Sequence, residues 1–373
     1  MKHANTLSPM LRAAKLMTLG TFAAFFCVPL AQSQGETPRF EVDPHWPKAL
    51  PDRWVTGAIG GVCVDGRDHV FVLNRQDLTD NELDAGHQAP PVMEFDAEGN
   101  LVNSFGDPEV VPSALHGCTV DKDDNVWMAG ARDGIVQKYA HDGSKLLLQI
   151  GKRGTVDSSD GTLKGKALNA SHTGFFESAG IAVDPVNGDI YVADGEGHDS
   201  NHRVAVFDRN GQYLRQWQPH RAESEVGDDF LPIVHCIAMS NDGHLYICDR
   251  RARRLQVFDK QGNFQKNIAI DFEQRTEYPK SQEHGPGASG TAVWVGFSPD
   301  KAQKFLYAVN PDDEQIEILD RGTGQVLASF GRAGHQLGEF TAAHFLAVDS
   351  KGSVYVGEVT GKRVQKFTRM DGH

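Results

Sequence analysis

The sequence predicts an all-β fold, a six-bladed β-propeller. The first observation is an internal repeat, in which an apolar strand, an Asp-containing turn and an aromatic-rich strand recur six times. The second is that most copies continue with two further short apolar strands joined by an Asp-x-x-Gly turn, which is typical of antiparallel sheets. A four-stranded sheet cannot bury both faces alone, whereas six sheets stacked around an axis can, and the ring leaves few free edges.

A linear β-solenoid is the alternative, and four strands in each repeat favour blades over coils. The six copies open with GVCVDGRDHVFVLNR (61–75), HGCTVDKDDNVWMAG (116–130), GIAVDPVNGDIYVADG (180–195), HCIAMSNDGHLYICDR (235–250), VWVGFSPDKAQKFLYAVNP (293–311) and HFLAVDSKGSVYVGEV (344–359).

The first 33 residues resemble a secretory signal. Lys2, Arg12 and Lys15 are basic, residues 16–31 are apolar and uncharged, and Ala31-Gln32-Ser33 suits cleavage. A single membrane anchor is the alternative, but the apolar run is short for a span of about 20 residues. We therefore expect a signal peptide over residues 1–33, a propeller domain over residues 34–373, and a periplasmic or secreted protein.

The last copy predicts how the ring closes. It stops after its third strand, at residues 364–367, and so lacks an outer strand. Residues 39–43 (RFEVD), just after the signal, have the pattern of that missing strand. We expect this N-terminal strand to complete the sixth blade.

Two insertions, residues 152–179 and 269–290, separate neighbouring copies. Both fall where one blade crosses to the next. They either shape a mouth over the central channel or form solvated loops.

Composition excludes some classes of partner. Signal removal takes away three of the 37 basic residues and none of the 50 acidic ones, which moves the formal net charge from −13 to −16. Such an acidic chain does not suit binding to nucleic acids or to anionic surfaces. No other segment is apolar enough to cross a membrane, and the sequence carries no signal for the oligomeric state.

Four cysteines remain after signal removal, namely Cys63, Cys118, Cys236 and Cys248. An even number in an oxidising compartment allows disulfides. All four lie inside apolar strand patterns, and none has C-x-x-C spacing. We expect them to be unpaired, buried small side chains.

Histidines recur at one position of the repeat. When the copies are aligned on the end of the first strand, His116, His235 and His344 open copies two, four and six. The other copies open with small residues, with Gly290 aligned in copy five. First strands line the channel of a propeller, so alternate blades would direct three imidazoles toward one axis. Three histidines with an open fourth position are the ligands of a catalytic zinc ion and also suit other divalent first-row metals; ordinary core histidines are the alternative.

Charged residues follow the ends of the second strands. Arg75 and Arg250 would stand on one rim near the metal, where they could bind a carboxylate or stabilise developing negative charge. Ordinary salt bridges to the rim acids Asp194, Asp249 or Glu358 are the alternative.

The third copy has an unusual rim loop, DGEGHDSNHR, over residues 194–203. It contains Glu196, His198, Asp199 and His202 in a Gly-flexible stretch. Such a loop could supply a general base beside the metal. A solvated turn and a calcium-binding loop are the alternatives.

The repeats resemble NHL-type propellers over nearly all of the mature chain. More narrowly, LHGCTVDKDDNVWMAG, VHCIAMSNDGHLYICDR and AHFLAVDSKGSVYVGEV resemble the metal-bearing segments of peptidyl-α-hydroxyglycine α-amidating lyases. The resemblance implies zinc bound by His116, His235 and His344, with Arg75 and Arg250 as the rim arginines. It also implies cleavage of an N-alkyl hemiaminal to an amide and glyoxylate.

This sequence departs from that family at two positions. Glu196 stands where the family has a catalytic Tyr, although Asn201 and Arg203 of the same loop match. Phe345 stands where the family has an Asp, which argues against a calcium site that uses this position.

Three functions follow from these observations. The first is a metal-dependent lyase for a small hydroxylated, hemiaminal-like carboxylate, as a small molecule or a peptide, with Glu196 as general base. The second is a metal-dependent hydrolase such as a lactonase, which would use bound hydroxide as nucleophile. The third is a non-enzymatic binding propeller.

Overall fold

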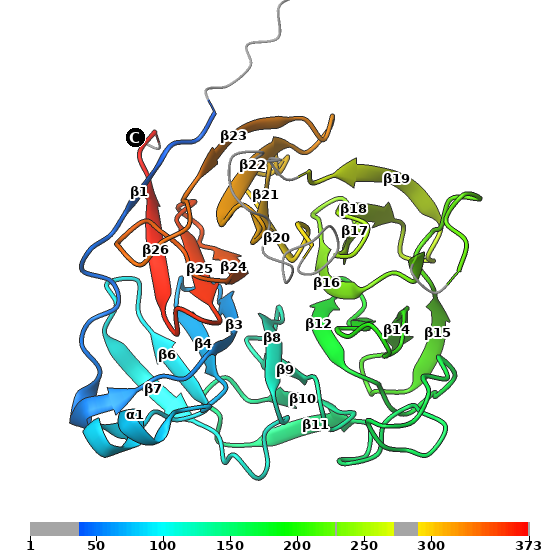
Figure 1. Ribbon diagram of the computed structural model, residues 1–373, viewed down its shortest axis with the longest axis horizontal. Coiled ribbons are helices and arrows are strands. Elements are labelled where there is room, and N and C mark those ends of the chain that lie inside the picture. The colour runs from blue at the N-terminus through cyan, green and yellow to red at the C-terminus, as the bar shows by residue number, and fades with distance from the viewer. Residues whose placement is uncertain (1–36, 228–229, 272–289, 372–373) are drawn as a thin grey trace, which may run out of the picture. The chain divides into compact units, whose positions relative to one another are not determined.

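Six four-stranded antiparallel sheets surround a central channel in the computed structural model, which describes residues 37–227, 230–271 and 290–371 (Figure 1). The first strands of neighbouring sheets contact one another around the whole ring, and the first strand of the sixth blade returns to that of the first. The predicted six-bladed propeller is therefore confirmed. The predicted signal peptide, residues 1–33, lies outside the described residues.

The strands of each blade are given from the channel outward. Blade 1 comprises β3 (Ile59–Val64), β4 (Val70–Asn74), β6 (Val92–Phe95) and β7 (Leu101–Phe105). Blade 2 comprises β8 (Leu115–Val120), β9 (Val126–Gly130), β10 (Val136–Tyr139) and β11 (Leu146–Ile150). Blade 3 comprises β12 (Ser178–Val183), β13 (Ile190–Asp194), β14 (Arg203–Phe207) and β15 (Tyr213–Trp217).

The second half of the ring repeats this order. Blade 4 comprises β16 (Val234–Met239), β17 (Leu245–Asp249), β18 (Arg254–Phe258) and β19 (Phe264–Ala269). Blade 5 comprises β20 (Trp294–Phe297), β21 (Phe305–Asn310), β22 (Gln315–Asp320) and β23 (Val326–Phe330). Blade 6 comprises β24 (Ala343–Val348), β25 (Val354–Glu358), β26 (Val364–Arg369) and β1 (Phe40–Val42).

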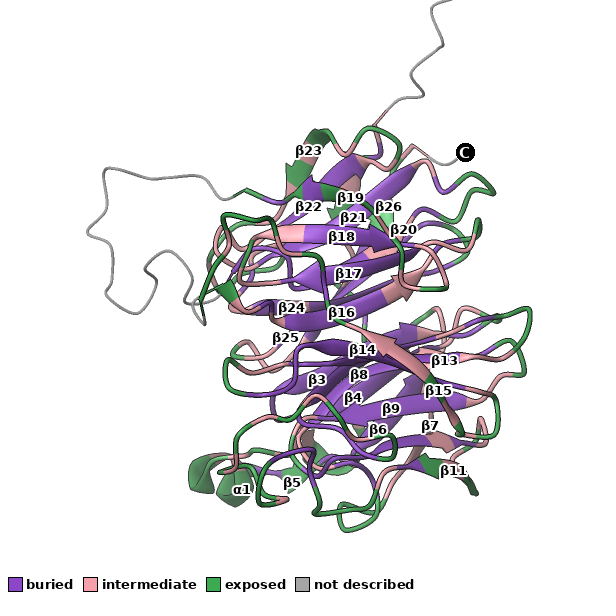
Figure 2. Cartoon of the chain, turned by 90° about the vertical axis from the view of Figure 1, so that its right-hand side faces the viewer, coloured by how far each residue is buried: buried purple, intermediate pink, exposed green. Residues whose placement is uncertain are grey.

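The core lies between the blades. All residues of β4, β9, β13, β17 and β25 are buried, whereas outer strands such as β11 are largely exposed (Figure 2). Each second strand carries a large aromatic side chain with little or no solvent exposure, such as Phe71, Trp127 and Tyr191. These aromatic side chains explain the aromatic-rich strand of the repeat, because they fill the space between neighbouring sheets.

The N-terminal strand completes the sixth blade, as the sequence predicts. β1 pairs antiparallel with β26, with Phe40 opposite Arg369 and Val42 opposite Phe367. The Phe40 ring also packs against Phe330 at 4.8 Å and Tyr307 at 5.6 Å, both in blade 5. The first and last strands of the propeller are thus joined in one sheet.

The expectation of unpaired cysteines is wrong. Cys63 and Cys118 form a disulfide between β3 and β8, and Cys236 and Cys248 form another between β16 and β17. Cys236 and Cys248 are direct partners in the strand register, and the first pair joins adjacent blades whose inner strands lie side by side. Strand patterns describe each cysteine alone, whereas pairing depends on which strands are neighbours. Two disulfides are consistent with an oxidising, extracytoplasmic compartment.

Little other regular structure is present among the described residues. A 3-10 turn (Pro51–Arg53) leads into β2 (Trp54–Val55), which pairs with β5 (His87–Gln88), and the helix α1 (Asp80–Ala85) precedes β5. No described helix has both the length and the apolar character that a membrane crossing requires. Of the two predicted insertions, residues 152–179 are irregular up to 177 and end in the first two residues of β12, and most of 269–290 lies outside the described residues.

Candidate metal centre

The three histidines occupy β-bulges at the start of alternate first strands. Val234 pairs with Asp249 and Cys236 with Cys248, so His235 is an extra residue between two register positions. His344 has the same place between Ala343 and Phe345, and His116 lies in the irregular stretch between Leu115 and Cys118. Because an extra residue bends the strand and re-aims its side chain, each bulge turns an imidazole into the channel.

The repeat position of copy five needs a correction. Trp294 pairs with Val309 as Cys236 pairs with Cys248, so Val293, not Gly290, is the counterpart of His235. Copy five departs from the repeat pattern of the other copies, so an alignment based on sequence alone places its first strand in the wrong register.

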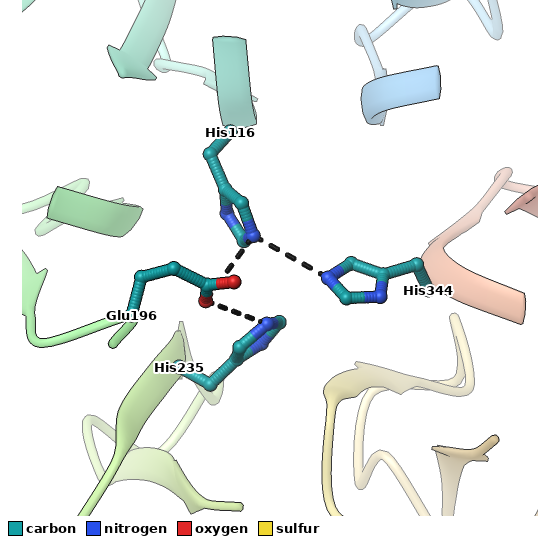
Figure 3. A group of neighbouring side chains, drawn as sticks. All are labelled: His116, Glu196, His235 and His344. Atoms are coloured by element: carbon teal, nitrogen blue, oxygen red, sulfur yellow. Dashed lines mark hydrogen bonds and ion pairs between the residues drawn. The ribbon is translucent and has the colours of Figure 1, made fainter. Parts of the chain in front are cut away.

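Figure 3 shows the three imidazoles converging on one point together with Glu196. His116 Nε2 lies 3.4 Å from His344 Nε2 and 3.3 Å from Glu196 Oε2. His235 Nε2 lies 2.8 Å from the same carboxylate oxygen, and the four ligand atoms all lie within 4.8 Å of one another. The predicted convergence of the histidines is therefore confirmed, whereas metal binding itself stays a prediction.

Backbone carbonyls fix the orientation of two of these rings. His116 Nδ1 lies 2.8 Å from Ala179 O, and His235 Nδ1 lies 2.7 Å from Val293 O. A carbonyl oxygen only accepts, so each Nδ1 carries a proton, and in the neutral ring Nε2 then presents its lone pair to the centre. Such a bond from the distal nitrogen is the usual support of a metal-ligating histidine.

The centre lacks a positive charge that its donors require. His235 Nε2 and Glu196 Oε2 are both buried without a hydrogen-bond partner, although they lie 2.8 Å apart. Two lone pairs at that distance repel each other unless a cation lies between them. Ligands 2.0–2.1 Å from a tetrahedral zinc ion are separated by about 3.3 Å, close to the observed spacings. The residues present therefore fit a divalent first-row metal such as zinc.

Protonation states agree with this fit. Burial lowers the pKa of His235 to about 4, and burial together with the other two histidines lowers the pKa of His344 well below its usual value. Burial raises the pKa of Glu196, whereas His116 and His235, when they carry a proton, hold that pKa well below its usual range; a metal cation at the same place would act in the same direction. Neutral imidazoles and an ionised carboxylate are the forms that bind metals.

The rim arginines lie near this centre, and the rim acids are bound by other arginines. Asp194, Asp249 and Glu358 pair with arginines at the start of the third strands: Arg203 and Arg254 open theirs, and Arg363 directly precedes β26. No ion pair found among the described residues joins Asp194, Asp249 or Glu358 to Arg75 or Arg250.

Arg250 reaches Glu196 directly, and Arg75 contacts the sequence neighbours of two of the histidines. Arg250 Nη1 lies 3.6 Å from Glu196 Oε1. The Arg75 guanidinium donates through Nε to Leu115 O at 3.0 Å and lies 6.0 Å from the centroid of the Phe345 ring. Burial lowers the pKa of Arg75, while the charge of Glu196 raises it. The channel mouth therefore holds two cations beside the metal ligands.

The loop that carries Glu196 is held at its base. Arg203 Nε donates to Asp194 Oδ2 at 2.8 Å, and Asn201 Nδ2 donates to the same oxygen at 2.7 Å and to Asp157 Oδ2 at 3.0 Å. Asp157 belongs to the insertion at 152–179, so that insertion supports the loop rather than being only a solvated surface segment. The residues that match the resembled family thus serve to anchor the loop.

The other candidates in the loop do not reach the centre. His198 is 57% exposed beside the exposed Asp199, and His202 Nδ1 bonds Pro232 O at 2.7 Å. The loop oxygens do not gather as a calcium site requires within the described residues. Of these candidates, Glu196 alone joins the histidines.

Sequence reasoning missed two neighbours of the centre. The backbone carbonyl of Glu177 accepts from the N–H of Glu196 at 2.9 Å, and burial together with Glu196 raises the pKa of the Glu177 carboxyl. Trp294, from the degenerate fifth copy, packs 5.1 Å from Phe345 and 6.4 Å from His116. Gly117 has φ +78° and would bring a Cβ to 2.7 Å from this indole, so only glycine fits there.

No protein-family model matches the chain. The chain is 27% identical over 348 residues to peptidyl-glycine alpha-amidating monooxygenase B of Xenopus laevis, which covers 88% of the chain and 35% of that protein. It is 24% identical over 344 residues to NHL repeat-containing protein 3 of Homo sapiens, which covers 90% and 85%. It is 25% identical over 260 residues to peptidyl-alpha-hydroxyglycine alpha-amidating lyase 1 of Drosophila melanogaster, which covers 68% and 44%.

The chain therefore spans about a third of the length of the amidating monooxygenase and most of the length of NHL repeat-containing protein 3. Among solved structures, a streptogramin B lyase matches with a TM-score of 0.53 at 13% identity, over 90% of this chain and 98% of that one. At this identity the likeness concerns the fold alone. The chain is an NHL-repeat-like six-bladed β-propeller with distant sequence similarity to amidating enzymes and to NHL repeat-containing protein 3.

Proposed function

We propose that this propeller is a metal-dependent lyase that acts on a small hydroxylated, hemiaminal-like carboxylate. The observation that carries the proposal is the convergence of His116, His235, His344 and Glu196 within 4.8 Å, with Arg250 beside the carboxylate. The similarity to an amidating lyase and to amidating monooxygenases supports the same reaction class.

The three histidines would hold the metal through Nε2. Bound there, zinc supplies a Lewis acid that lowers the pKa of a coordinated hydroxyl group. Trp294 and Phe345 pack beside His116, where their aromatic side chains would limit the access of water from within the channel. Exclusion of water strengthens each electrostatic contact in the site.

Glu196 would act as the base. Its carboxylate takes the proton of the substrate hydroxyl, a C=O double bond forms at that carbon, and the C–N bond breaks with its electron pair passing to nitrogen. Glu196 then returns the proton to that nitrogen. For an N-acyl α-hydroxyglycine the products are an amide and glyoxylate, with no other reactant.

Arg75 and Arg250 would bind the substrate carboxylate. A guanidinium binds a carboxylate through two parallel hydrogen bonds, which would also fix the orientation of the hydroxyl. Without substrate, Arg250 faces Glu196 at 3.6 Å. A substrate carboxylate that takes over Arg250 would leave Glu196 free to turn toward the hydroxyl, and Gly195 and Gly197 on either side of it permit that movement.

A non-enzymatic binding propeller is the second candidate. The observation in its favour is that NHL repeat-containing protein 3, whose name states no activity, matches over 85% of its own length. Under this alternative the histidines would bind metal without turnover, or would not bind it.

The test uses residues 34–373 with the metal content measured before assay. N-benzoyl-α-hydroxyglycine should yield equal amounts of benzamide and glyoxylate. His235→Ala should lose the metal of this site and lower kcat/KM by at least about 100-fold, whereas His198→Ala, an exposed histidine of the same region, should change neither.

If the metal-loaded protein released no glyoxylate from this substrate, the proposed lyase function would be contradicted. Hydrolysis of a lactone by the same protein would then favour a hydrolase, and inactivity toward both would favour the binding propeller.

A further inference from the structure

A second group of metal-binding side chains lies at the seam between blades 1 and 2. It comprises Asp65 after β3, His69 before β4, Glu94 in β6 and His141 in the turn after β10, and is called the seam cluster below. The histidines of the channel open their strands, whereas Asp65 follows the end of a first strand. The two groups are therefore separated by the length of a six-residue strand, about 20 Å.

The ligand atoms of the seam cluster are already close together. His69 Nδ1 lies 2.7 Å from Glu94 Oε1, and His141 Nε2 lies 2.8 Å from Asp65 Oδ2 and 3.8 Å from Glu94 Oε1. One atom each from Asp65, His69 and Glu94 falls within 4.8 Å of the others, whereas His141 lies outside this compact group and reaches Asp65 and Glu94 only. These separations bracket the distance of about 3.3 Å between ligands of a tetrahedral zinc ion.

Burial makes the charges of this cluster costly. The Asp65 and Glu94 side chains are 0% and 5% exposed, so two carboxylates lie together out of water. The equivalent position in blade 2 carries the opposite charge. Lys138 occupies the strand position that Glu94 has in blade 1, and it pairs with Asp121 at 2.9 Å. Blade 1 thus has a second carboxylate where blade 2 has a cation.

A neighbouring arginine supplies only part of the missing charge. Arg67 Nη2 lies 3.0 Å from Asp65 Oδ2 and also contacts His141, but its side chain is 54% exposed. The two carboxylates thus share one guanidinium, and the two histidines lie within hydrogen-bonding distance of them. A divalent cation would neutralise both carboxylates, and Arg67 could turn into solvent.

The surroundings hold the cluster in place. Asp65 Oδ1 accepts from the backbone N–H groups of Arg67 and His69, both at 2.8 Å, which directs Oδ2 toward His141. The His141 ring packs edge-on against Phe71 at 5.1 Å. The His69 and His141 side chains remain 27% and 21% exposed, so an ion can enter from solvent.

We propose that the seam cluster is a second metal site, which binds a divalent first-row metal such as zinc through Asp65, His69, Glu94 and His141. Four protein ligands leave no open position, so the site is structural and fastens blade 1 to blade 2. It does not depend on the function proposed for the channel.

The test counts metal ions on the mature chain. Metal-free protein is dialysed against buffered zinc, and bound zinc is measured by mass spectrometry. The parent chain should bind two ions, the pair Glu94→Gln with His141→Asn should bind one, and His235→Ala should bind one. His87→Asn, at an exposed histidine, should still bind two.

A parent-like zinc count in the Glu94→Gln/His141→Asn protein would overturn the proposal. A parent-like count in His235→Ala would instead contradict the channel site, so the two failures are distinguishable. Cobalt(II) binding to the His235→Ala protein is a second measurement, in which the residues of the seam cluster are not mutated. The protein should show the visible absorption of a tetrahedral cobalt ion. Absence of this absorption would also overturn the seam site.

Arg67→Ala separates the metal site from a simple ion-pair network. Removal of a competing cation should increase zinc affinity at the seam cluster and leave the count at two. Loss of the seam ion in this variant would contradict the proposal.

Discussion

Single residues decide the chemistry at the channel, and Glu196 is the most informative of them. Glu196→Gln keeps the size of the side chain but removes the charge that faces His116 and His235. We expect a fall in kcat/KM of about 10²- to 10⁴-fold because the base is lost. We also expect weaker zinc binding in the channel, because the negative charge beside the three histidines is lost. Unchanged turnover in this variant would show that another group removes the proton.

A second residue, Glu317 in β22, predicts a pH dependence of stability. Burial raises its pKa to about 7, and one of its oxygens accepts from Asn310 Nδ2 at 2.7 Å. Because the folded-state pKa lies above the unfolded one, the native state binds the extra proton. Stability from this group is present below about pH 4.5 and is lost as the pH rises through 7.

Glu317→Gln should therefore flatten the pH profile of the free energy of unfolding between about pH 4.5 and 7. The difference from the parent should be on the order of 3 kcal/mol across this range. Urea denaturation at several pH values measures it. Parallel profiles for the two proteins would mean that this carboxyl titrates normally.

At the scale of elements, closure of the ring depends on β1. Phe40 packs against Phe330 and Tyr307 of blade 5, whereas Glu41 beside it is exposed. Phe40→Ala should lower the free energy of unfolding by about 2–3 kcal/mol, and Glu41→Ala should change it by less than about 0.5 kcal/mol. Equal effects of the two substitutions would argue against closure by this strand.

The disulfides make a second prediction at this scale. Cys63–Cys118 spans 55 residues of sequence and Cys236–Cys248 spans 12. Loop-closure entropy then predicts losses of about 4 and about 3 kcal/mol when each pair is replaced by alanine. Chemical denaturation of the two paired variants gives the order, and a larger loss for the Cys236/Cys248 pair would contradict an entropic origin.

At the scale of the whole molecule, the repeat carries most of what the sequence can predict. The six copies of the repeat predict the number of blades, the closing strand and the histidines on alternate first strands, because these features depend on a periodic pattern. The Cys63–Cys118 bond and the seam cluster join residues of different blades, so no local pattern contains them. Glu196 could be proposed as a base from its loop, but its contact with His235 depends on how that loop folds over the channel.

The arrangement also separates two tasks. One end of the first strands holds the candidate metal centre with Arg75 and Arg250, and the other end holds the seam cluster. The first strands that join the two ends pair with buried second strands, and such a packed scaffold keeps ligands in fixed positions. A catalytic metal site at one end and a structural metal site that joins blades 1 and 2 at the other end are therefore compatible within one fold.

Diffraction from crystals of the zinc-loaded mature protein at the zinc absorption edge tests the channel centre most directly. We predict an anomalous peak about 2.1 Å from Nε2 of His116, His235 and His344. Density at that point without an anomalous signal, in crystals that contain zinc elsewhere, would contradict the proposed metal centre and with it the lyase.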